Sequence, residues 1–223
     1  MAEARAASLH GHERNVRLLL DKGTDVNAQG GRSATALQVA SANGHAKIVE
    51  LLIGKGADVN AQDRNFASAL QVASAEGHEK IVELLLGENV NVDAQSGRFA
   101  TALQASSSTG HERIVRLLLD KGADVNAQGG RLATALQVAS VNGHNKIVQV
   151  VLDKGADVDA QSEWFATALQ LASLHGHEKI VQLLLDAGAD VNARGGSYAT
   201  ARQLASTKGH EKIIELLLDN NDR

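Results

Sequence analysis

Gly143-His144 is one of seven Gly-His pairs that stand 33 residues apart along this chain. The other six are Gly11-His12, Gly44-His45, Gly77-His78, Gly110-His111, Gly176-His177 and Gly209-His210. A fixed period of this length is typical of a solenoid, in which each repeat packs against its neighbours and an extended surface is displayed. The period predicts one continuous array over residues 1–223, with seven repeats of approximate bounds 1–29, 30–62, 63–95, 96–128, 129–161, 162–194 and 195–223.

The composition limits what such an array can contain. Hydrophobic residues make up 43% of the chain but aromatic residues only 2%, so the core must be built from Leu, Ile, Val and Ala. The sequence has no cysteine, which excludes disulfides and thiolate metal sites. A net charge of -4 gives no reason to expect nucleic acid or an anionic membrane as a partner. No apolar stretch approaches the roughly 18 residues of a membrane span, so we expect a soluble, cytoplasmic protein.

A Thr or Ser followed three residues later by Gln predicts the start of a helix in six repeats. In this capping box the hydroxyl accepts from the backbone N–H three residues on, while the Gln side chain reaches back. A glycine ends this short helix, and the apolar spacing after Gly-His, as in residues 80–86, predicts a second helix. An extended segment and a variable turn, together called the finger, lead to the next repeat. The six boxes are Thr35/Gln38, Ser68/Gln71, Thr101/Gln104, Thr134/Gln137, Thr167/Gln170 and Thr200/Gln203.

Together these residues resemble the ankyrin repeat, because Gly-His, Ile-Val, Leu-Leu-Leu and Gly-Ala-Asp-Val-Asn-Ala recur in order over essentially the whole chain. The chain departs from the family in having Thr/Ser-Ala-Leu-Gln where Thr-Pro-Leu-His is usual. This variant is similar to arrays of fungal NACHT-type proteins, and it is also similar to an engineered or consensus-derived array. The resemblance implies an all-α solenoid that binds a protein or peptide through its fingers and the concave face of its first helices, with no chemistry of its own.

The two terminal repeats have polar residues at positions that are apolar inside the array. Asn15 stands where interior repeats have Ile, and Arg202 stands where they have Leu. Terminal repeats of a solenoid need such replacements because one of their faces meets water. We therefore expect a capped array and a monomer.

Three features could suggest chemistry, and each has a simpler explanation. Equivalent histidines in stacked repeats would lie about 8–10 Å apart, too far to share a metal. We expect instead structural imidazoles that hydrogen-bond locally at the start of the second helix. His10 with His12, and His175 with His177, are i, i+2 pairs that would not face each other on a helix. The Gly-Gly pairs lack the Gly-Lys-Ser/Thr of a phosphate loop, so we predict no catalytic residue, no cofactor and no metal.

The candidate binding residues are those that differ between repeats, and all five aromatic residues are among them. They lie two or three residues before a capping box, in the fingers, together with Arg side chains. Aromatic residues and Arg are enriched in binding hot spots, although packing of finger against finger is the alternative. We expect Trp164 to be exposed, because its column otherwise contains Arg, Asn and Ser. The candidates in these two columns are Arg32, Phe66, Arg98, Phe99, Arg131, Leu132, Trp164, Phe165 and Tyr198.

Two further groups of residues vary in the same way. Val141, Leu174 and His175 follow their capping boxes by seven or eight residues and are predicted to join Trp164 and Phe165 in one apolar zone. Neutral variation on a solvated surface is the alternative for this zone.

A possible basic line along the finger tips consists of Arg32, Arg64, Arg98, Arg131 and Arg194. These arginines could simply be solvated surface charges, since aspartates lie in the same loops. The functional alternative is that they bind an acidic peptide. Taken together, the residues favour a non-enzymatic protein-interaction module. The alternative is an engineered or structural scaffold with no natural partner.

Overall fold

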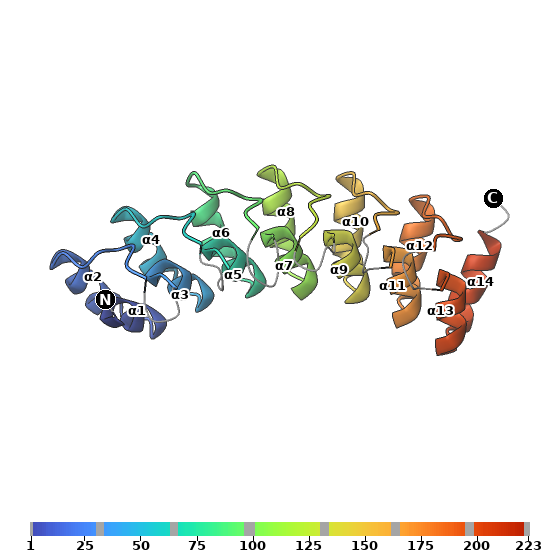
Figure 1. Cartoon of the computed structure of the whole chain (residues 1–223), viewed down its shortest axis with the longest axis horizontal. Coiled ribbons are helices and arrows are strands. Elements are labelled where there is room, and N and C mark those ends of the chain that lie inside the picture. The colour runs from blue at the N-terminus through green and yellow to red at the C-terminus, as the bar shows by residue number, and fades with distance from the viewer. Residues whose placement is uncertain are drawn as a thin grey trace. The chain divides into compact units, whose positions relative to one another are not determined.

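The computed structural model describes residues 2–29, 34–62, 67–95, 101–129, 134–161, 166–194 and 199–220. Within these ranges the fold is all-helical and every repeat contributes two helices, which confirms the predicted helix-turn-helix solenoid (Figure 1). The chain forms two compact units, each described by itself. Residues 1–106 with 113–123 form the N-terminal unit, and residues 107–112 with 124–223 form the C-terminal unit.

Odd-numbered helices are the first helices of their repeats and even-numbered helices are the second. The N-terminal unit contains α1 (Ala2–Leu9), α2 (Glu13–Asp21), α3 (Ala36–Ala42), α4 (Ala46–Gly54), α5 (Ala69–Ala75), α6 (Glu79–Leu86) and nearly all of α8 (Glu112–Asp120). Helix α7 (Ala102–Thr109) is divided between the units. The C-terminal unit contains α9 (Ala135–Val141), α10 (Asn145–Asp153), α11 (Ala168–His175), α12 (Glu178–Asp186), α13 (Ala201–Lys208) and α14 (Glu211–Asp219).

Within each unit the helices form two layers. First helices pack on first helices, as α9, α11 and α13 do in turn, and second helices pack on second helices, as α10, α12 and α14 do (Figure 1). Ala139 and Ala172 are fully buried in the first-helix layer, where small side chains let neighbouring helices approach closely. Leu136, Ile147 and Leu169 are among the largest fully buried side chains. The core is therefore aliphatic, as the composition predicts.

Gln137 fixes both the start of its own helix and the next finger. Thr134 Oγ1 accepts from the Gln137 backbone N–H at 3.3 Å, and the Thr134 N–H donates to Gln137 Oε1 at 2.8 Å, which confirms the capping box. The nitrogen of the same side-chain amide, Gln137 Nε2, donates to the carbonyl oxygens of Ala160 and Ala166, both at 3.0 Å. Gln38 and Gln170 make the same set of bonds in their repeats. One buried side chain thus joins two successive repeats.

The Gly-His pair is a contact between repeats. His177 Nε2 lies 3.1 Å from the carbonyl oxygen of Val141 in the preceding repeat, and because a carbonyl only accepts, this nitrogen carries the hydrogen. The ring lies over Gly143, where an added Cβ would be 2.8 Å from His177 Cε1. The same pairing joins His45 to Gly11, His78 to Gly44, His144 to Gly110 and His210 to Gly176.

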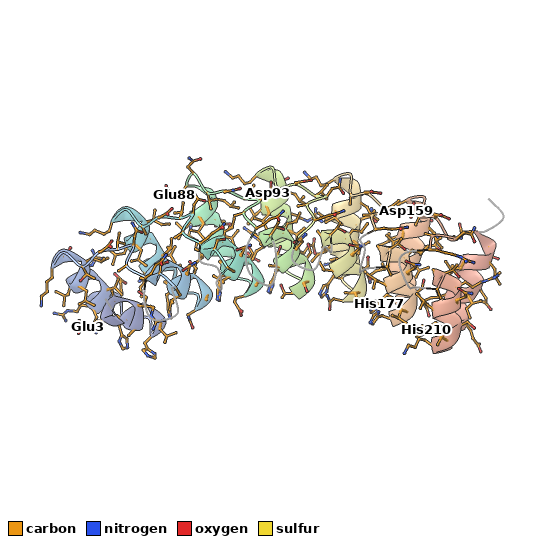
Figure 2. All side chains as sticks on the ribbon, viewed as in Figure 1. Glu3, Glu88, Asp93, Asp159, His177 and His210 are labelled. Atoms are coloured by element: carbon orange, nitrogen blue, oxygen red, sulfur yellow. The ribbon has the colours of Figure 1, made fainter. Side chains whose placement is uncertain are left out.

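The predicted structural role of these histidines is confirmed, but the predicted local hydrogen bond is wrong. His177 and His210, labelled in Figure 2, are the N-cap residues of α12 and α14. Neither makes a side-chain capping bond. Each ring instead reaches a carbonyl 36 residues earlier in the chain. The ring fits there only because the preceding repeat has glycine beneath it, and this packing explains why the pair recurs along the chain.

Gly143→Ala should destabilise the chain more than Gly209→Ala, its counterpart in the last repeat. Both glycines have a positive φ, +78° and +74°, so alanine costs about 1–2 kcal/mol at either position. At Gly143 the new methyl also meets the His177 ring, whereas no described atom lies within 4 Å of that position at Gly209. Overpacking of this kind adds about 1–3 kcal/mol. Urea unfolding measures both losses, and equal values would contradict the ring contact as the reason for glycine.

A second polar connection lies at the base of the fingers. Asn126 Nδ2 donates to the carbonyl of Gly155 at 3.2 Å, and its Oδ1 accepts from the Asp157 N–H at 2.8 Å. Asn27 and Asn60 connect their repeats in the same way. Asp159, labelled in Figure 2, occupies this position one repeat later, and its Oδ1 accepts from the Asp190 N–H at 3.0 Å. A carboxylate has no hydrogen to donate, so this connection has one bond fewer.

Asp159→Asn should therefore stabilise the chain, because the amide can donate to the carbonyl of Gly188 as Asn126 does to that of Gly155. The expected gain in the free energy of unfolding is about 0.5–1.5 kcal/mol. The reciprocal change, Asn126→Asp, should lower stability by at least as much. Thermal unfolding of the two variants beside the parent chain tests the pair, and shifts of the opposite sign would refute this role of the amide.

Candidate functional site

The C-terminal unit displays an aliphatic surface on its first helices, which we call the first-helix patch. It consists of Val138 and Val141 on α9, Leu171 and Leu174 on α11, and Leu204 on α13. Residues three apart lie on one side of a helix, and α11 packs against both α9 and α13, so these side chains belong to neighbouring helices of one layer.

The patch side chains are less buried than the core side chains of the same helices. Val138, Val141, Leu174 and Leu204 are half-buried, and Leu171 is 9% exposed. The core leucine of the same helix, Leu169, is fully buried. The patch residues are therefore held by their neighbours and still present apolar surface to the outside.

Polar side chains at the helix ends next to the patch are fixed by hydrogen bonds to their own helices. Asn142 Nδ2 donates to the carbonyl of Val138 at 2.8 Å, and Thr207 Oγ1 donates to that of Gln203 at 2.8 Å. His175 Nδ1 lies 2.9 Å from the carbonyl of Leu171, which makes this nitrogen a donor. The rim of the patch is consequently polar and restrained, a property that reduces the ordering cost of binding.

The prediction that the i, i+2 histidine pairs do not face each other is wrong. The rings of His175 and His177 are stacked at 6.2 Å with an interplanar angle of 11°, and those of His10 and His12 lie 5.9 Å apart. The two histidines do not share a helix, because His175 ends α11 and His177 precedes α12, and the turn between them brings the rings together. This stacking further fixes His175 at the rim.

The first helices of the C-terminal unit carry no carboxylate. Among α9, α11 and α13 the ionisable side chains are His175, Arg202 and Lys208. The helical carboxylates of this part of the chain lie on the second helices: Asp153, Glu178, Asp186, Glu211, Glu215 and Asp219. A hydrogen-bonded ion pair of 2.7 Å with Glu178 raises the pKa of Lys212 there. The first-helix layer is thus apolar and cationic although the chain is acidic overall.

The first helices of the N-terminal unit have smaller side chains at the same positions. Val39 and Ala42 on α3 are half-buried, as is Val72 on α5, while Ala75 is 8% exposed. Asn43 Nδ2 donates to the carbonyl of Val39 at 2.8 Å, so the rim residue is fixed in the same way. The two units therefore share the architecture of this surface but differ in how much apolar side chain they offer.

The structure places three of the predicted site residues. Val141 and Leu174 lie half-buried in the first-helix patch, and His175 is exposed at its rim. The sequence analysis did not select Val138, Leu171 and Leu204. Each stands four residues after the Thr that begins its capping box, a position whose residue type also varies between repeats. Ten predicted residues lie outside the described ranges and stay predictions: Arg32, Arg64, Phe66, Arg98, Phe99, Arg131, Leu132, Trp164, Phe165 and Tyr198.

In the part of the chain that the structure describes, no three His, Asp or Glu side chains gather as metal ligands. No helix among the described residues has the length and apolar character needed to cross a bilayer.

The repeat geometry agrees with a known family. A family model described as ankyrin repeats (three copies) matches residues 4–96, 70–162, 131–195 and 161–223. The chain belongs to the ankyrin-repeat family. Among solved structures it is similar to the human ASB11 ankyrin repeat domain, with a TM-score of 0.85 and 25% sequence identity over 96% of each chain. No match was found among curated protein sequences. Ankyrin repeats are in general non-enzymatic modules of protein–protein interaction.

Proposed function

We propose that this ankyrin array is a non-enzymatic module that binds a partner protein through the first-helix patch and the fingers beside it. The observation that carries the proposal is the run of half-buried aliphatic side chains across α9, α11 and α13, on a layer without carboxylates. Apolar residues at the centre of a surface with a polar rim are the usual arrangement of a binding interface. We therefore propose that the binding site lies on the last three repeats, which carry the patch.

The variable finger residues fit the same location. Arg131 and Leu132 precede the capping box of α9, Trp164 and Phe165 precede that of α11, and Tyr198 precedes that of α13. Each helix that carries the patch is therefore preceded by an aromatic residue or leucine. We propose that these side chains complete the interface, with Trp164 as its main anchor.

The end residues support action as a monomer. Asn15 and Arg202 are both exposed, and a polar or charged side chain at a stacking position opposes association of one copy on another. The absence of cysteine suits a reducing cytoplasm.

The test is an affinity measurement on a stoichiometric partner purified with the full chain. Leu174→Ala and Trp164→Ala should each weaken the complex by more than about 2 kcal/mol in calorimetric titration if they are hot spots. Leu218→Ala is the control, because Leu218 is an exposed leucine (44%) that lies on α14, outside the patch. The Leu174 variant should unfold within about 1 kcal/mol of the parent, unlike Leu169→Ala at about 2–5 kcal/mol. Equal affinities for all three variants would remove Leu174 and Trp164 from the interface. Failure to find any stoichiometric partner would favour a scaffold without a partner.

A further inference from the structure

A small cavity lies in the last repeat, between the base of the finger that leads into it and the helices α13 and α14. Its volume is about 180 Å³, and it is bounded by the finger base at Asn192 and Arg194, the start of α13 at Arg202 and Gln203, and Leu217 of α14. Two arginines and two amide residues, Asn192 and Gln203, therefore line one hollow. The described residues around it include no carboxylate.

The other repeats of the C-terminal unit show what the Gln203 position normally binds. Gln170 Nε2 donates to the carbonyls of Ala193 and Ala199, at 3.1 and 3.0 Å, on the two sides of the next finger. Gln203 keeps the capping box, because its Oε1 accepts from the Thr200 N–H at 2.9 Å. No carbonyl among the described residues accepts from its Nε2. Gln203 lines the cavity, and the same donor in other repeats binds the carbonyls that flank the next finger.

Arg202 determines which kind of chain can cover this end. The equivalent leucines, Leu136 and Leu169, are 1% and 0% exposed beneath the following repeat, whereas Arg202 is exposed. A further apolar repeat placed on this face would bury a guanidinium without a partner, which is strongly unfavourable. A segment that brings carboxylates would instead form charge-assisted hydrogen bonds with Arg202 and Arg194.

We propose that this end cavity binds an extended acidic segment of a partner protein. Backbone carbonyls of the segment accept from Gln203 Nε2, as Ala193 and Ala199 accept from Gln170, and its carboxylates pair with Arg202 and Arg194. The cavity shares α13 with the first-helix patch, but none of the patch residues lines it. The site also assigns a binding role to Arg194, the described member of the basic line of the fingers.

The proposal is tested by titrating the isotopically labelled full chain with an end-capped octapeptide of alternating glutamate and alanine, followed by NMR. The Gln203 side-chain amide and the Nε–H signals of Arg194 and Arg202 should shift saturably. The corresponding lysine–alanine peptide should leave them in place. Shifts spread over all cationic side chains, or none at the cavity, would overturn the proposal.

Two variants with matched controls identify the contacts. Arg202→Gln should weaken peptide binding by about tenfold or more, as expected for loss of a charge-assisted pair. Lys179→Gln, which removes one positive charge from α12, should leave the affinity within about twofold. Gln203→Glu keeps Oε1 for the capping box but removes the donor and should also weaken binding, whereas Gln161→Glu adds the same charge elsewhere. Equal effects of site and control variants would contradict the assignment.

Sedimentation velocity tests whether the cavity instead binds a second copy of this chain. If the cavity signals move with protein concentration alone and the sedimentation coefficient rises with them, the face binds another copy and the acidic segment is wrong. A constant sedimentation coefficient, together with saturable binding of the glutamate peptide, supports the proposal. Because the patch variants Leu174→Ala and Trp164→Ala leave this cavity unaltered, its failure is distinguishable from failure of the proposed function.

Discussion

The hydrogen bonds of one glutamine side chain per repeat determine how the next repeat is placed. Gln170 is 1% exposed, and its amide completes a capping box with one end while the other end donates to two carbonyls of the following finger. The aliphatic layers supply most of the stabilisation, but burial of apolar surface has no preferred direction. A buried amide with fixed hydrogen-bond partners does have a preferred direction, and the loss of any partner costs free energy. It therefore sets the position of each finger relative to the helix before it.

The two binding surfaces proposed for this chain both follow from that arrangement. Within the C-terminal unit, stacking in register places Val141 and Leu174 at equivalent points of neighbouring helices, so larger side chains at this position accumulate in one patch. At the start of α13 no described carbonyl accepts from Gln203 Nε2, and Arg202 stands where other repeats have leucine. An apolar face and a cationic end thus arise from one repeat by substitution at a few positions.

The sequence was sufficient for the fold because local signals and the period agree. Thr134 with Gln137 marks a helix start at single-residue accuracy, and the structure confirms both bonds of the box. The role of the Gly-His pair was only half predicted, since the period cannot say whether His177 bonds within its own turn or to the repeat before it. That answer requires knowledge of the backbone of two stacked repeats at once.

The candidate site was predicted less completely, for a related reason. In a short helix rich in small residues, Val138 looks the same whether it faces a neighbouring helix or the outside. Arg202 was correctly predicted to face water, but its association with Arg194 and Gln203 depends on the base of the finger, residues 191–194, lying beside α13. Variation between repeats identified Val141 and Leu174 because they differ in size from their equivalents, Ala42 and Ala75.

The most direct test of the central claim compares Gln170→Glu with Gln203→Glu in the full chain. Glutamate preserves the capping box at both positions, but at Gln170 it also places a carboxylate against two buried carbonyls. Equilibrium unfolding should show a loss of about 2–4 kcal/mol for Gln170→Glu and less than about 0.5 kcal/mol for Gln203→Glu. Equal losses, or a negligible loss at Gln170, would contradict the account that the amide joins one repeat to the next.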